Sequence, residues 1–173
     1  MAKGENFINV AVIGVSQRGI GLIDCLNSMD DVKISVVCDL YEDRMENASN
    51  AIFEKRGYKP FCCKDYREVI QRDDVDCIII STAWSAHINI AIASMKAGKP
   101  VGMEVGGAYS IQECWDLVKT KEETGVEFMM LENCCYGREE LAVLNMVKQG
   151  VFGEIVHCQG GYQHDLRHEV AMG

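Results

Sequence analysis

The chain has 173 residues, 48% of them hydrophobic, which suffices for one domain with a buried core and part of a second. Its formal net charge of −9 argues against nucleic acid and against anionic membrane surfaces as partners. The chain opens on a short polar segment, so we expect no signal peptide, no membrane span and a cytoplasmic location.

The first predicted element is an apolar strand followed by a glycine-containing turn and a helix, with the sequence VAVIGVSQRGIG at residues 10–21. Gly14 permits a tight turn at the strand end, and Gly19 lets the helix pack close to the sheet. The helix N-terminus then offers N–H groups to a pyrophosphate. Ser16 stands where this fingerprint usually has its second glycine.

An acidic residue, Asp39, closes the next predicted strand, 20 positions after Gly19. Its carboxylate can accept hydrogen bonds from the adenosine ribose hydroxyls and repels a 2′-phosphate, so NAD is favoured over NADP. Strand, turn, helix and acid together predict a dinucleotide-binding unit, with an ordinary strand-to-helix turn as the alternative.

Strands and helices alternate along the chain to about residue 150. Apolar runs predict strands at residues 9–14, 33–38, 60–63, 75–81, 100–103 and 127–131. Periodicity and capping signals predict helices at residues 19–29, 42–55, 66–71, 85–97, 110–124 and 137–149. The alternation predicts an α/β fold, a Rossmann-type doubly wound parallel sheet in the order 3-2-1-4-5-6 with helices on both faces.

The predicted helix at residues 110–124 opens with a capping box formed by Ser110 and Glu113. It also carries an apolar stripe at helical spacing, formed by Ile111, Cys114, Trp115 and Val118.

The character of the sequence changes after Gly150. Residues 151–153 have the composition of a turn, and residues 154–163 alternate loosely, as the first strand of a new element would. We therefore expect an NAD-binding Rossmann domain over residues 1–150. Residues 151–173 are expected to begin a C-terminal open-sheet domain that is incomplete in this sequence.

The nine cysteines indicate reduced thiols rather than disulfides or a zinc site. No C-x-x-C pair occurs, and Cys62-Cys63 and Cys134-Cys135 are adjacent, a spacing that suits neither zinc nor an ordinary disulfide. We expect most of them to act as small buried hydrophobic side chains.

The carboxyl ends of the predicted strands meet at one edge of the sheet, where ligands of open α/β sheets bind. The candidate cofactor-binding residues at this edge are Gly14, Ser16, Gln17, Arg18, Gly19, Asp39, Ser81, Trp84, His87, Glu104 and Asn133. Alternatives stay open for three of them: His87 lines the cofactor or only packs, Trp84 flanks the cofactor or caps the sheet, and Glu104 serves the site or is only structural.

The first two thirds of the chain resembles the glucose–fructose oxidoreductase, inositol dehydrogenase and MocA family. Four later segments are similar to the family 109 glycoside hydrolases, which are NAD-dependent α-N-acetylgalactosaminidases. These segments are ECWDLV at 113–118, MLENCCYGR at 130–138, VFGE at 151–154 and GGYQHDLR at 160–167.

The resemblance implies an unusual glycosidase reaction on a carbohydrate substrate. Bound NAD⁺ removes hydride from C3 of the sugar, a base removes the proton at C2, and the glycosidic leaving group is eliminated. Water then adds, and NADH returns the hydride. Paired carboxylates are then not required. The resemblance makes His164 an acid/base and Tyr136 and Tyr162 further catalytic residues, with Tyr136 packing against the cofactor as the alternative.

One departure from the wider family favours the hydrolase. A Glu-Lys-Pro motif follows the fifth strand in dehydrogenases of that family, whereas here Glu104 is followed by Val105. The alternatives are a sugar or polyol dehydrogenase, and a truncated, non-catalytic nucleotide-binding fragment. Whether a homo-oligomer or a second chain completes the site is left open.

Overall fold

The computed structural model describes residues 7–161, 163, 165 and 167. The chain divides into two compact units, Met1–Glu132 and Asn133–Gly173. Helix α6 (Arg138–Lys148), which has no buried residue, belongs to the second unit. The domain boundary expected after residue 150 stays a prediction.

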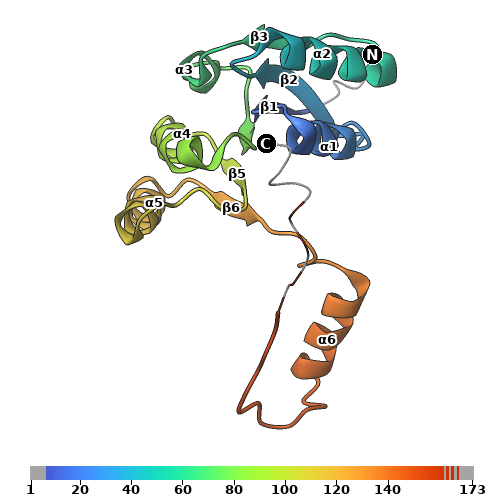
Figure 1. Cartoon of the computed structure of the whole chain (residues 1–173), viewed down its shortest axis with the longest axis vertical. Coiled ribbons are helices and arrows are strands. Elements are labelled where there is room, and N and C mark those ends of the chain that lie inside the picture. The colour runs from blue at the N-terminus through green and yellow to red at the C-terminus, as the bar shows by residue number, and fades with distance from the viewer. Residues whose placement is uncertain (1–6, 162, 164, 166, 168–173) are drawn as a thin grey trace, which may run out of the picture. The chain divides into compact units, whose positions relative to one another are not determined.

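The first unit is built on a six-stranded parallel sheet in the order β3-β2-β1-β4-β5-β6, as the sequence predicts (Figure 1). Its strands are β1 (Ile8–Ile13), β2 (Val32–Cys38), β3 (Phe61–Cys63), β4 (Cys77–Ile80), β5 (Val101–Glu104) and β6 (Phe128–Leu131). The order changes direction at β1, since β2 pairs with one side of β1 and β4 with the other. That reversal is the place where such sheets bind ligands.

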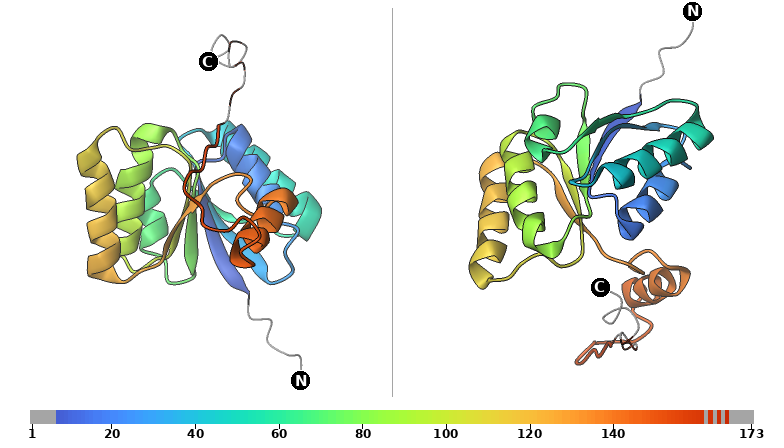
Figure 2. Two further views of the ribbon diagram at one scale, coloured as in Figure 1. Left: turned by 90° about the horizontal axis from the view of Figure 1, so that it is seen from below. Right: turned by 45° about the horizontal axis from the view of Figure 1, so that its top comes forward.

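Helices cover both faces of this sheet (Figure 2). On one face lie α1 (Gln17–Leu26) and α2 (Glu42–Arg56), and on the other lie α3 (Tyr66–Ile70), α4 (Trp84–Lys96) and α5 (Ile111–Thr124). The strands are apolar on both faces, so each layer of helices encloses its own core. Val10 and Val12 of β1 belong to one core, and Ala11 and Ile13 to the other.

The capping box predicted at the start of α5 is present. The Ser110 hydroxyl accepts a hydrogen bond from the Glu113 amide, and the Glu113 carboxylate accepts one from the Ser110 amide. The apolar stripe on this helix faces solvent, however, with Ile111 80% and Trp115 57% exposed. Leu117 of α5 packs against the core, and Thr120 of the same helix is buried.

The cysteines are all free thiols, as expected, but their burial differs from the expectation. Cys38 and Cys63 are buried, whereas Cys25 and Cys114 are exposed because they lie on the outer faces of α1 and α5.

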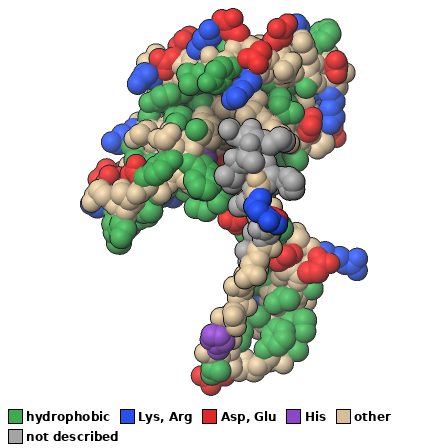
Figure 3. Space-filling view, viewed as in Figure 1, with side chains coloured by type: hydrophobic (Ala, Val, Ile, Leu, Met, Phe, Trp, Pro, Cys, Tyr) green, Lys and Arg blue, Asp and Glu red, His purple; other side chains and the backbone are tan. Residues whose placement is uncertain are grey.

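In the second unit, the strand expected over residues 154–163 is wrong for the part of that segment that is described. Residues 154–161 have no strand conformation. A strand needs a neighbour for its backbone hydrogen bonds, and none of the described residues pairs with this segment. Figure 3 shows hydrophobic side chains at the surface of this unit, and those of α6 include Leu141, Leu144 and Val147.

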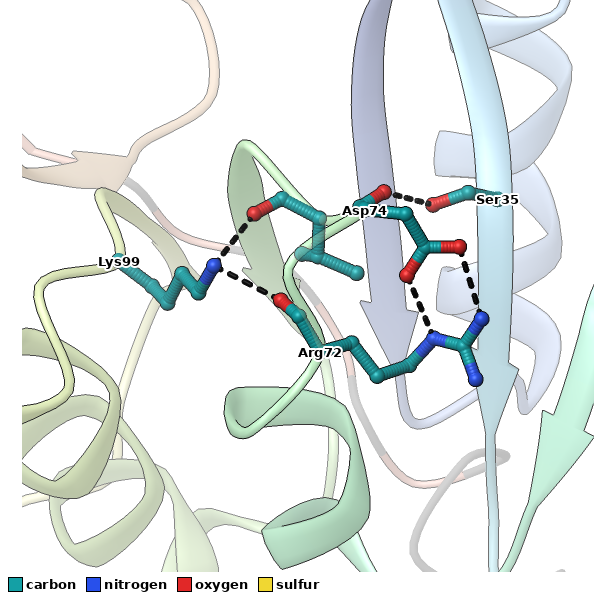
Figure 4. Close-up of polar contacts among 5 residues, drawn as sticks. Ser35, Arg72, Asp74 and Lys99 are labelled. Carbon is teal, nitrogen blue, oxygen red and sulfur yellow. Dashed lines mark hydrogen bonds and ion pairs between the residues drawn. The ribbon is translucent and has the colours of Figure 1, made fainter.

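At the amino end of β4, a partly buried lysine connects the loop before β5 to the loop before β4 (Figure 4). Lys99 Nζ donates hydrogen bonds of 2.8 Å to the carbonyl oxygens of Arg72 and Val75. The Arg72 guanidinium forms a bidentate ion pair with the Asp74 carboxylate, at 2.8 and 2.7 Å. The Asp74 carbonyl oxygen accepts a hydrogen bond from the Ser35 hydroxyl. The network fixes the chain entering β4 to the chain entering β5.

We predict that Lys99→Met lowers the free energy of unfolding by about 1–3 kcal/mol, because two carbonyl groups lose a charged donor. Chemical denaturation monitored by circular dichroism measures the change. Lys119→Met is the matched control, since Lys119 is exposed on α5 and should change the stability little. Equal stabilities of the two variants would contradict this role for Lys99.

Candidate functional site

The turn between β1 and α1 has the geometry that the glycine fingerprint requires. Gly14 has φ +88°, and a Cβ on it would lie 2.6 Å from backbone atoms of Ser81 and Thr82. Gly19 is buried in the first turns of α1, where a Cβ would lie 2.2 Å from the Gly14 carbonyl oxygen. Helix and strand therefore approach more closely than any side chain at these two positions allows.

The peptide group that joins Gly14 to Val15 is held at both of its polar atoms. Ser81 Oγ at the end of β4 donates a 2.7 Å hydrogen bond to the Gly14 carbonyl oxygen. Asp39 Oδ2 at the end of β2 accepts a 2.8 Å hydrogen bond from the Val15 amide. Asp39 Oδ1 also accepts a hydrogen bond from the Tyr41 amide at 3.0 Å. The carboxylate therefore stabilises both the turn that follows β1 and the turn that follows β2.

A cavity of about 860 Å³ opens at the carboxyl ends of β1, β2, β3 and β4. Four residues predicted from the sequence line it, namely Gly14, Ser16, Asp39 and Ser81. Ser16 is the N-cap residue of α1, but its side chain makes no capping hydrogen bond. Its hydroxyl therefore lines the cavity without a bond to the helix.

Sequence reasoning missed a second set of cavity residues. They follow β2 and β3, and include Leu40, Tyr41, Arg44, Lys64, Tyr66 and Arg67. The cations are largely paired: Lys64 with Glu42 at 2.6 Å, and Arg67 with Asp65 at 3.2 Å. The guanidinium of Arg44 lies 4.5 Å from the centre of the Tyr41 ring. Their position directly after strand ends is the signal that could have found them.

Cys38, the last residue of β2, also lines this cavity. Burial raises the pKa of its thiol well above the usual value, and the neighbouring Cys63 adds to the increase. The thiol therefore stays neutral and contributes an apolar wall.

A second group of predicted residues lies around the loop that follows β5. Gly106 has φ +89°, and a Cβ on it would lie 2.5 Å from the Trp84 indole. Gly107 is likewise packed against His87. The His87 ring is buried, with Nε2 2.9 Å from the Thr82 carbonyl oxygen. The Trp84 side chain is 60% exposed and so has one face available to a ligand.

Glu104 at the end of β5 forms an ion pair with Arg18 of α1, with 2.7 Å between Oε1 and Nη2. The hydrogen bond to Glu104 raises the pKa of Arg18, which keeps the guanidinium charged. The pair links the start of α1 to the far half of the sheet edge, and so joins two predicted site residues directly.

The structure does not place the remaining predicted residues in the cavity or around the loop that follows β5. Gln17 begins α1 but does not line the cavity. Asn133 and the exposed Tyr136 belong to the second unit. Tyr162 and His164 lie outside the described residues.

Across the described ranges, no helix is long and apolar enough to cross a membrane. The same residues contain no group of three or more His, Cys, Asp or Glu side chains placed to hold a metal ion.

Sequence comparison identifies two families along the chain. Residues 8–132 match the oxidoreductase family with an NAD-binding Rossmann fold, and residues 136–172 match the C-terminal domain of glycosyl hydrolase 109. A glycosyl hydrolase family 109 protein from Shewanella sp. (strain ANA-3) is 41% identical over 171 residues. An α-N-acetylgalactosaminidase from Shewanella oneidensis is 40% identical. Each alignment covers 96% of this chain, and the chain spans 37% of the length of these relatives.

Solved structures share the fold at low sequence identity. Scyllo-inositol dehydrogenase from Lactobacillus casei with bound NAD(H) and scyllo-inositol superposes with a TM-score of 0.77 at 16% identity, covering 86% of this chain and 43% of that one. A 3-ketoreductase from Actinomadura kijaniata in complex with NADP gives a TM-score of 0.69 at 23% identity, covering 87% and 46%. The likeness confirms the predicted Rossmann architecture.

Proposed function

The chain belongs to the oxidoreductase family with an NAD-binding Rossmann fold, and we propose that it is the NAD-binding part of a glycoside hydrolase acting on an N-acetylgalactosaminide. The family binds NAD or NADP. The finer assignment to NAD rests on Asp39, and the assignment to glycoside hydrolysis rests on similarity to family 109 proteins over nearly the whole chain.

The residues of the site fit a dinucleotide. The α1 N-terminus at the Gly14–Gly19 turn supplies amide donors and a partial positive charge for the pyrophosphate. Asp39 Oδ1 and Oδ2 each accept one backbone amide, which leaves each oxygen a second lone pair for a ribose hydroxyl. The cavity beyond β2 and β3 has room for the adenosine half.

Trp84 and the loop that follows Glu104, at the ends of β4 and β5, would hold the other half of the dinucleotide. NAD supplies a hydride acceptor at this end when bound. Val105 stands where the dehydrogenases of this family carry their catalytic lysine, so these residues offer no ammonium group beside the hydride-transfer position. This favours a glycosidase over a sugar or polyol dehydrogenase.

We predict that the chain binds NAD⁺ at least about tenfold more tightly than NADP⁺, because a 2′-phosphate beside the buried Asp39 carboxylate costs about 1.4 kcal/mol or more. Isothermal titration calorimetry with each dinucleotide measures the ratio. In Asp39→Asn the side chain keeps its size and loses its charge, and the ratio should fall. NADP⁺ binding as tight as NAD⁺ binding would contradict the assignment.

An assay with 4-nitrophenyl α-N-acetylgalactosaminide and NAD⁺ distinguishes the reactions. A hydrolase releases 4-nitrophenol with no net NADH, whereas a dehydrogenase accumulates NADH at the expense of sugar. We expect the 173 residues alone to bind NAD⁺ without turnover, and a fusion to the remaining part of the Shewanella oneidensis relative to release 4-nitrophenol. Accumulation of NADH by the fusion would favour the dehydrogenase.

A further inference from the structure

We propose that Asp39 and Ser81 are positioning residues that clamp one peptide group and so preset the turn that receives the pyrophosphate. The inference rests on the proposed function, because it concerns the same dinucleotide site. We call the Gly14–Val15 peptide with these two side chains the peptide clamp.

In the clamp, two side chains that follow different strands form hydrogen bonds with the two polar atoms of the same peptide. Ser81 Oγ bonds its oxygen at 2.7 Å, and Asp39 Oδ2 bonds its N–H at 2.8 Å. The side chains come from the ends of β4 and β2, the two strands that pair with β1. Both residues are buried, with Ser81 5% and Asp39 8% exposed, so water does not replace these bonds easily.

The orientation of this peptide determines how closely α1 approaches the strand. The Gly14 oxygen points into the space where a Cβ on Gly19 would lie, at 2.2 Å, and Ser81 Oγ lies 3.0 Å from the same position. If the peptide rotated, both bonds would be lost and the oxygen would leave the space beside Gly19 that it now occupies. The first-turn amides of α1, which have no intrahelical acceptors, therefore take their position from the clamp.

The clamp also occupies the Val15 amide. This N–H is used by Asp39 and so does not serve as a pyrophosphate donor. The same carboxylate that recognises the ribose thus holds the turn for the pyrophosphate. Ser81, in turn, supports dinucleotide binding through a hydroxyl whose hydrogen is already used by the Gly14 carbonyl.

The test compares ADP with adenosine, because only ADP needs the pyrophosphate turn. We expect Ser81→Ala to raise the dissociation constant for ADP about tenfold and to change that for adenosine less than about threefold. Saturation-transfer NMR measures both ligands on the full chain. Ser94→Ala is the matched control: Ser94 is fully buried and donates to the Ile90 carbonyl within α4, so its loss should affect stability but neither ligand.

Equal weakening of ADP and adenosine by Ser81→Ala, or unchanged ADP binding, would overturn the clamp. Failure of the unaltered chain to bind ADP would instead contradict the proposed function. Amide hydrogen exchange gives a check that needs no variant at Ser81. The Val15 amide should be strongly protected in the unaltered chain and lose protection in Asp39→Ala, and rapid exchange of Val15 in the unaltered chain would also overturn the clamp.

Discussion

Replacement of Gly19 by alanine is expected to weaken NAD⁺ binding about a hundredfold or more, which corresponds to ~2.7 kcal/mol. The added Cβ would lie 2.2 Å from the Gly14 carbonyl oxygen, and this neighbour is backbone in a tightly held turn. The N-terminal end of α1 must therefore move away from β1, and the amides that receive the pyrophosphate move with it. Calorimetric titration measures the loss, and thermal unfolding measures any accompanying change in stability.

Gly21 supplies the matched control in the same helix, two residues later. A Cβ at Gly21 meets no atom within 4 Å. Gly21→Ala should therefore leave NAD⁺ affinity unchanged and stabilise the helix by about 0.5–1 kcal/mol. If Gly19→Ala bound NAD⁺ within about threefold of the unaltered chain, the close approach of helix and strand would not be what positions the pyrophosphate.

Replacement of Gly106 by alanine is expected to weaken NAD⁺ about tenfold while leaving ADP affinity unchanged. A Cβ there would lie 2.5 Å from the Trp84 ring and would displace it, and the backbone at φ +89° disfavours any side chain. The effect falls on the half of the dinucleotide beyond the pyrophosphate, which ADP lacks. Titrations with NAD⁺ and ADP separate the two halves.

Gly98→Ala separates backbone strain from the contact with Trp84. Gly98 has φ +77°, close to that of Gly106, but a Cβ on it meets nothing within 4 Å. The Gly98→Ala variant should lose some stability and keep full NAD⁺ affinity. Equal loss of NAD⁺ and ADP affinity in Gly106→Ala would show that the loop after β5 acts on the whole cleft rather than on its far half.

The sheet order and the glycine turn were predictable because their determinants are local in sequence. Continuous apolar runs specify buried parallel strands, and the spacing from Gly14 to Asp39 specifies how β1, α1 and β2 connect. The capping box of α5 was predictable for the same reason, since Ser110 and Glu113 are three residues apart.

The parts that the sequence did not reveal depend on contacts between distant residues. The bond from the Val15 amide to Asp39 spans 24 positions, and that from Ser81 to Gly14 spans 67. No spacing rule indicates that these two bonds share one peptide. Over the described residues 154–161, the predicted strand is absent for a related reason, because alternation alone cannot form a strand without a neighbour. The expected roles of Tyr136, Tyr162 and His164 stay predictions.

We propose that NAD binds across the carboxyl edge of this sheet through the Gly14–Gly19 turn and Asp39. A crystal structure of the chain grown with saturating NAD⁺ tests it most directly. We expect the pyrophosphate at the N-terminus of α1, the adenosine ribose hydroxyls on the Asp39 carboxylate and the nicotinamide beside Trp84. A dinucleotide bound elsewhere on the chain, or a cleft that stays empty at saturating NAD⁺, would contradict it.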